Sequence, residues 1–120
     1  MLTIPPNPPA REKKPEPPRP AAAPTNVNLL QVNLFASGAL LLMFDGIVTV
    51  DVANPPTTWS FNGTTSIQEG YTINYGTSVY LLLNGPADFG APVVIAANDP
   101  GARTPDGGYV NAATLVVSDL

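Results

Sequence analysis

The apolar residues after about residue 25 gather in short runs that turn residues separate. Residues 57–61 alternate apolar and polar positions, which is the period of a strand with one buried face. Residues 39–44 are apolar throughout, as is typical of a strand at the centre of a sheet. No segment sustains the period of a helix. The pattern therefore predicts strands at residues 27–34, 39–44, 47–51, 57–61, 71–75, 77–83, 92–97 and 113–117.

Turn residues fall between these runs at intervals of about eight to twelve residues, the spacing of an antiparallel sandwich or barrel. The dipeptides Asp45-Gly46 and Asn62-Gly63 predict hairpin turns, because both readily adopt the left-handed backbone conformation. Residues 98–108 predict a long loop. We therefore predict an all-β fold, an Ig-like antiparallel β-sandwich of seven to eight strands.

The alternation also predicts which side chains enter the core. We expect Trp59 and Phe61 to share the buried face of their strand, and Leu30, Val32 and Leu34 to share that of the first strand. The segments 79–83 and 93–97 are apolar enough to need covering if they formed sheet edges. This makes a homo-oligomer plausible.

The first 24 residues differ from the rest in composition. They contain nine of the fifteen prolines and carry a net charge of +2, whereas the remainder carries −6. Proline at this density excludes helix and favours polyproline II, in which 24 residues at about 3.1 Å each would reach roughly 75 Å. The sequence therefore predicts an extended proline-rich N-terminal arm, residues 1–24, attached to one β-sandwich domain, residues 25–120.

The arm is the predicted partner-binding site. A polyproline II segment loses little conformational entropy on docking, and its basic residues suit an acidic protein surface. The expected contact residues are Ile4, Pro5, Pro6, Pro8, Pro9, Arg11, Lys13, Lys14, Pro15, Pro17, Pro18, Arg19 and Pro20.

Catalytic chemistry has little to build on, since the chain contains no histidine and no cysteine, and both of its lysines lie in the arm. Aspartate pairs are conceivable at Asp45 with Asp51 and at Asp99 with Asp106, but aspartates in turns usually accept local hydrogen bonds. Oxygens of Asn98, Asp99 and Asp106 could hold calcium, although their spacing matches no established calcium loop. We predict no catalytic residue, no metal and no cofactor.

Other partners are also disfavoured. The glycines form no phosphate-binding loop, and the basic cluster of the arm is diluted by two glutamates, so we expect no nucleotide or nucleic-acid binding. The longest apolar run is too short for a membrane span and the first residues lack a signal-peptide core, which predicts a soluble protein without a secretory address. A sugar-binding platform of aromatic residues is a weaker alternative to ordinary core and strand roles; its candidates are Trp59, Tyr71, Tyr75, Tyr80 and Tyr109.

Two adjacent segments carry a family resemblance. Residues 42–51, Leu-Met-Phe-Asp-Gly-Ile-Val-Thr-Val-Asp, and 54–63, Asn-Pro-Pro-Thr-Thr-Trp-Ser-Phe-Asn-Gly, resemble the Ig-like modules of small structural proteins of tailed bacteriophages. Among those proteins, capsid decoration or cement proteins are most similar in plan, with a small β body and an extended terminal arm that joins neighbouring capsomers.

The resemblance implies a non-enzymatic virion protein on the capsid surface whose arm binds the major capsid protein or another repeated shell protein. Without that setting, the absence of a secretion signal predicts a cytoplasmic location. Two alternatives stay open. One is a surface adhesion or glycan-binding Ig-like module that uses the arm as a stalk and the loop 98–108 as its binding site. The other is a head-tail or tail component.

Overall fold

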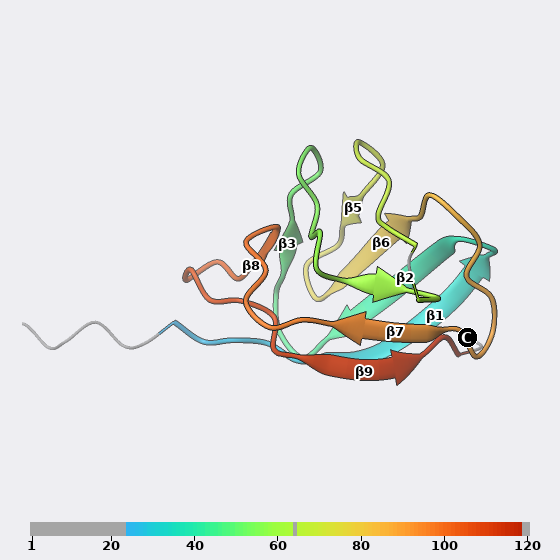
Figure 1. Ribbon diagram of the computed structural model, residues 1–120. Helices are drawn as coiled ribbons and strands as arrows, with labels where there is room; N and C mark the ends of the chain where they lie inside the picture. The colour runs from blue at the N-terminus through green and yellow to red at the C-terminus, as the bar shows by residue number, and fades with distance from the viewer. Residues whose placement is uncertain (1–23, 64, 119–120) are drawn as a thin grey trace, which may run out of the picture.

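The computed structural model describes residues 24–63 and 65–118, which form nine strands and no helix (Figure 1). Each strand lies within or beside a segment that the hydrophobic pattern predicts, with one exception, β8, which lies inside the predicted loop 98–108. The strands are β1 (Leu29–Ala36), β2 (Ala39–Phe44), β3 (Thr49–Val50), β4 (Ser60–Phe61), β5 (Ile73–Asn74), β6 (Ser78–Leu82), β7 (Pro92–Ile95), β8 (Ala102–Arg103) and β9 (Ala113–Val116).

Seven of the strands form two antiparallel sheets, ordered β1-β2-β6-β5 and β4-β7-β9. This order corresponds to the ABED and CFG sheets of a constant-type immunoglobulin domain, which confirms the predicted Ig-like sandwich. The strand count is nine because β3 and β8 pair with each other as a separate two-stranded ribbon. The predicted arm lies outside the described residues, except for its last residue, Pro24.

The core lies between the two sheets and is apolar. It takes Val32, Leu40, Leu42, Val79 and Leu81 from the four-stranded sheet, and Phe61, Val93 and Ile95 from the three-stranded sheet. Trp59 and Phe61 are both buried, as the alternation predicts, and the Trp59 ring lies 6.4 Å from that of Phe44 between centroids. Since the chain contains no cysteine, aliphatic side chains of β2 and β7 occupy the region that a disulfide crosses in antibody domains.

The prediction for the first strand is wrong at one position. Leu30 is 59% exposed, whereas Leu29 and Val32 are buried. The pairing of β1 with β2 shifts register between Leu29 and Gln31, which is the signature of a β-bulge. The extra residue reverses the alternation at Leu30, so the side chain points away from the core.

Of the two predicted hairpin turns, one is confirmed and one is wrong. Asn62 and Gly63 both have positive φ, 51° and 90°, and Phe61 and Thr65 exchange backbone hydrogen bonds across them. Asp45-Gly46 does not join paired strands, because β2 pairs with β1 and β6 while β3 pairs with β8. The Asp45 carboxylate instead accepts hydrogen bonds from the backbone and side-chain amides of Asn28.

The strongly apolar strands lie inside their sheets. β6 pairs with both β2 and β5, and β7 pairs with both β4 and β9, so neither forms an edge. At the outer strand β5, the Asn74 side chain hydrogen-bonds the backbone amide and carbonyl of Val50, which ties β3 to that edge. The edge argument for a homo-oligomer therefore no longer holds, and a homo-oligomer stays a prediction without that support.

We predict that Gly101→Ala destabilises the fold more than Gly90→Ala does. A Cβ atom on Gly101 would lie 2.5 Å from the Pro56 nitrogen and 2.8 Å from the Pro55 carbonyl carbon, and backbone atoms cannot yield as side chains do. We expect a loss of about 2–3 kcal/mol in the free energy of unfolding, measured by urea denaturation. Gly90 has open space around it but a φ of +77°, so alanine there should cost about 1 kcal/mol. Equal costs would contradict the backbone overlap.

Candidate functional site

The predicted partner-binding residues, from Ile4 to Pro20, lie outside the described residues. The structure does describe the point at which the arm joins the sandwich. We call residues 25–28 the arm root. In Figure 1 the root lies at the end of the molecule that carries the β3–β8 ribbon, away from the C-terminus. The site is therefore built from the root and the surfaces around it.

Backbone hydrogen bonds attach the root to the segment before β9. The Val27 amide donates to the Tyr109 carbonyl at 3.0 Å, and the Asn111 amide donates to the Val27 carbonyl at 2.9 Å. Val27 and Val110 form a parallel bridge, and both side chains are buried. The root thus pairs in parallel with the segment before β9, and it precedes β1 in the chain.

Side chains reinforce this attachment. The Asn26 amide group accepts a hydrogen bond from the Tyr109 backbone at 3.0 Å and donates to the Asn111 side chain at 3.1 Å. The Asn111 side chain in turn donates to that of Asn28 at 2.9 Å. Asparagine can donate and accept at once, which lets one residue type connect the two parallel segments.

Asp106 fixes the outermost residue of the root. Its carboxylate accepts hydrogen bonds from the Thr104 hydroxyl and from the Thr25 backbone amide, the latter at 2.9 Å. The hydrogen bond from Thr104, followed by that from Thr25, lowers the pKa of the Asp106 carboxyl below its ordinary value. The charged form of Asp106 is therefore favoured, and this form holds the root.

The loop that receives the root is itself braced by Arg103. Its guanidinium donates to the carbonyls of Gly107 and Gly108 and lies 4.2 Å above the Tyr109 ring centroid. A side chain on Gly108 would overlap the Thr25 carbonyl oxygen, so glycine is required for the close approach. Together these contacts give the arm a fixed origin on the sandwich.

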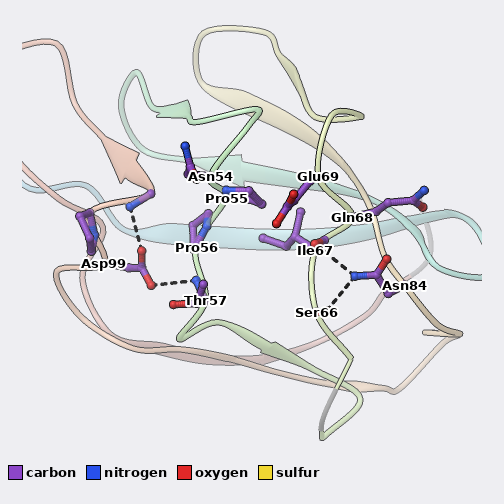
Figure 2. A pocket seen from close by; sticks show the side chains of 12 residues that line it. Asn54, Pro55, Pro56, Thr57, Ser66, Ile67, Gln68, Glu69, Asn84 and Asp99 are labelled. Carbon is purple, nitrogen blue, oxygen red and sulfur yellow. Dashed lines mark hydrogen bonds between the residues drawn. The ribbon is translucent and has the colours of Figure 1, made fainter.

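A polar groove of about 630 Å³ opens elsewhere on the surface, between the segments 54–57, 66–69 and 99–101 (Figure 2). The Asn84 side chain lies on one side, where it donates to the Ser66 hydroxyl at 2.8 Å and to the Ile67 carbonyl. Asp99 lies at the other end. The side chains of Asn84 and Asp99 are hydrogen-bonded to neighbouring protein atoms, so these two residues shape the groove.

Asp99 is 5% exposed and accepts four hydrogen bonds. Its donors are the Gly101 amide at 2.8 Å, the Thr57 and Thr58 amides at 3.1 and 3.0 Å, and the Thr58 hydroxyl. Burial opposes the charged form, but the hydrogen bonds outweigh it and hold the pKa of the Asp99 carboxyl below its ordinary value. Asp99 therefore anchors the segment that enters β4.

The carboxylates of the conceivable pairs each accept hydrogen bonds from other groups. Asp99 binds residues 57 and 58, whereas Asp106 binds the arm root. Asp45 binds Asn28, and Asp51 accepts the amides of Ala53 and Asn54 in its own turn at 3.0 Å each. The hydrogen bonds from Asn28 lower the pKa of Asp45. Within residues 24–63 and 65–118, no three acidic residues gather as a candidate metal site.

The aromatic residues separate into three settings. Trp59 is in the core, and Arg103 covers one face of the half-buried Tyr109 ring. Tyr71 and Tyr75 are exposed, and Tyr80 is half-buried. They belong to a surface that the sequence reading missed, the outer side of the β1-β2-β6-β5 sheet. We call this surface the aromatic face; it comprises Phe35, Met43, Tyr71, Ile73, Tyr75 and Tyr80.

Comparison with known proteins identifies a fold likeness. No protein-family model matches the chain, and no curated protein matches it significantly. Among solved structures, the N-terminal part of the bacterial S-layer protein SbsC is similar, with a TM-score of 0.51 and 15% sequence identity over 79% of this chain. The chain spans about a quarter of that structure, 24%. In the described residues, no helix could cross a membrane.

We predict that Asp99→Asn lowers the free energy of unfolding at pH 7 by about 2 kcal/mol, because its amide group would face donors that now meet a carboxylate. Since the folded-state pKa of Asp99 lies below the unfolded value of about 3.9, its stabilisation is complete above that value and is lost as the pH falls through the folded pKa. The difference between variant and wild type should therefore narrow at low pH. Urea titrations from pH 7 to pH 2 measure it.

The matched control is Asp88→Asn, at an exposed residue whose carboxylate accepts no hydrogen bond from the described residues. It should leave stability at pH 7 within about 0.5 kcal/mol of wild type. A stability difference for Asp99→Asn that stayed constant down to pH 2 would contradict the assigned role of the charge.

A third prediction concerns the arm root. Asn26→Ala removes the acceptor of the Tyr109 amide, so this amide should exchange its hydrogen several-fold faster, with a stability loss of about 1 kcal/mol. Hydrogen exchange followed by NMR measures both. Asn54→Ala is the control, because the Asn54 side chain makes no hydrogen bond with the described residues. Unchanged exchange at Tyr109 would mean that the backbone bridge alone holds the root.

Proposed function

We propose that this chain is a non-enzymatic structural protein that decorates a repeated protein shell, a capsid decoration or cement protein, with the arm lying across neighbouring shell subunits. The observation that carries the proposal is the arm root. Backbone and side-chain hydrogen bonds fasten residues 25–28 to the loop and segment at 106–111, so that force on the arm is transmitted into the sandwich. A tether that bears load needs such an attachment.

The acidic residues support a non-enzymatic role. A general acid needs a raised pKa, whereas hydrogen bonds lower the pKa values of Asp45, Asp99 and Asp106. Each of the three carboxylates accepts a backbone amide, and this charge-assisted hydrogen bond would weaken if the carboxylate became protonated. These residues serve the loops that they hold.

Charge supports a division of labour between arm and body. The arm carries +2 and the rest −6, so the arm suits an acidic groove on a partner, and a contact by the sandwich lies outside that groove. Two modest contacts, one by the arm and one by the body, reinforce each other through their tether. The likeness to an S-layer protein adds that this fold occurs in another structural protein.

A second candidate is an adhesion or glycan-binding module with the arm as its stalk. The exposed rings of Tyr71 and Tyr75 favour it, since flat aromatic surfaces suit ligands with an apolar side. The loop 98–108 favours it less. Tyr109, directly after the loop, lies under Arg103, and the loop's carboxylates hold the root and residues 57 and 58.

The test uses the fact that Lys13 and Lys14 are the only lysines in the sequence. An amine-reactive cross-linker applied to the native particle should join these residues, or the nearby N-terminus, to one abundant repeated shell protein, which mass spectrometry identifies. The variant Lys13→Arg with Lys14→Arg keeps the charge and should lose the lysine links. Links that reach other copies of this chain and no shell protein would contradict the proposed function.

A further inference from the structure

The aromatic face is an unusual surface for a strand sheet in water. The four strands β1, β2, β5 and β6 contain no charged residue at all. Cross-strand pairing places Asn33, Leu41, Tyr80 and Ile73 in one row across the sheet, with their side chains on the same side. Solvated sheet faces usually carry charges that keep other chains away.

Aromatic rings dominate this face toward its β5 edge. Tyr71, Ile73 and Tyr75 are each about half exposed or more, while Thr72 between them is buried, so the alternation turns the three side chains outward together. The Tyr80 ring on β6 stands edge-on to that of Phe35, 5.6 Å between centroids. The face therefore combines fixed rings with tyrosine hydroxyls, and its β5 side offers three neighbouring outward side chains.

Rings with hydroxyl donors and no charge match one kind of ligand, an extended proline-rich segment. Polyproline II has no internal hydrogen bonds, so its carbonyl groups are free to accept from tyrosine hydroxyls, and proline rings pack on aromatic side chains. We propose that the aromatic face binds such a segment, and that its occupant is the arm of a second copy of this chain, at residues 14–20.

The sequence of the arm fits the face in spacing. In polyproline II, residues three apart lie on the same side, which pairs Pro15 with Pro18 and Pro17 with Pro20. The distance from Lys14 to Arg19 is about 15 Å at 3.1 Å per residue. The outward side chains from Tyr71 to Tyr75 cover about 13 Å at 3.3 Å per residue. Five or six residues of the arm thus match the length of the tyrosine row.

Charge fits as well. Exposed carboxylates border the face along the chain, with Asp45 directly after β2 and Glu69 two residues before Tyr71. The segment 14–20 carries a cation near each end, Lys14 and Arg19, and one carboxylate, Glu16, between them, which leaves a net charge of +1. A cationic segment beside exposed carboxylates favours a specific peptide contact.

The position of the root favours a second copy over the same chain. The root continues β1, which lies at the opposite edge of the sheet from β5, about 14 Å away across three strand spacings. In Figure 1 the described start of the chain leaves the sandwich beyond the β8 end, directed away from the sheet. To reach its own face the arm would have to reverse, which a proline-rich segment resists.

This inference rests on the proposed function in one respect, because a repeated shell would hold neighbouring copies within reach of the arm. It assigns residues 14–20 to the neighbouring copy and leaves the first proline cluster, residues 4–9, for the shell. The test is made on the full chain without any particle. Its failure therefore leaves the cross-linking result to decide the proposed function, and absence of a shell partner leaves this contact standing.

The absence of cysteine makes a single label possible. Ala21→Cys carries a nitroxide next to the proline segment, in unlabelled protein mixed with ¹⁵N-labelled wild type. We expect concentration-dependent loss of the amide signals of Tyr71, Ile73, Tyr75 and Tyr80 in the labelled copy. The same spin-labelled variant, now carrying ¹⁵N and diluted into unlabelled wild type, reports on contact within one molecule. Signal loss in that sample without loss in the first mixture would assign the contact to the same molecule and overturn the proposal, as would no loss on this face in either sample.

Matched variants distinguish the specific arm contact from non-specific association. Ile73→Thr on the face should weaken the effect about fivefold or more, the scale on which one anchor residue acts. Val116→Thr, at a residue 58% exposed on β9 of the other sheet, should leave it unchanged. Pro17→Ala with Pro20→Ala should abolish the effect, whereas Pro5→Ala with Pro8→Ala should not. If both proline variants changed the signal loss to the same extent, the face would not bind residues 14–20 specifically, and the proposal would fail.

Discussion

The root and the first strand β1 together are hydrogen-bonded on both edges, to β2 along one side of β1 and to the C-terminal segment at two points on the other side. At the root, Val27 pairs with Val110, and near the other end Asn33 pairs with Ser118. The Leu34 amide donates to the Ser118 carbonyl, and the Ser118 amide donates to Val32. Because β9 belongs to the three-stranded sheet, these contacts connect the two sheets in a chain that has no disulfide to do so.

This double attachment explains why the loops are so heavily hydrogen-bonded. The bridge at Val27 requires the segment 108–111 to keep a fixed position beside the root. The contacts of Arg103, Asp106 and Gly108 together fix this position. The same loop contains β8, whose pairing with β3 extends the brace toward β5 through Asn74. One end of the sandwich is therefore a continuous hydrogen-bonded cap, and the arm begins from it.

Local signals in the sequence predicted the parts of the fold that depend on neighbouring residues. The turn at Asn62-Gly63 and the burial of Trp59 and Phe61 follow from positive φ preference and alternation, which a short window contains. The bulge at Leu30, the role of Asp45 and the strand β8 depend on partners elsewhere. The hydrogen bonds of the root join residues 81 and 83 positions apart, and a single sequence does not reveal such pairs. The aromatic face was missed for the same reason, since only the sheet order brings Phe35 beside Tyr80.

The distribution of charged residues connects the proposed shell decoration with the proposed contact between the arm and the aromatic face. Among the residues that the structure describes, Arg103 on β8 is the only charged residue in a strand, and the largest sheet has none. A surface of that kind is stable in water when it is small or when something covers it. The arm contains nine of the fifteen prolines and four of the five basic residues, so each part supplies what the other would recognise. In an array of copies, that complementarity would act between neighbours, and the braced root would convert each arm contact into a link between two folded bodies.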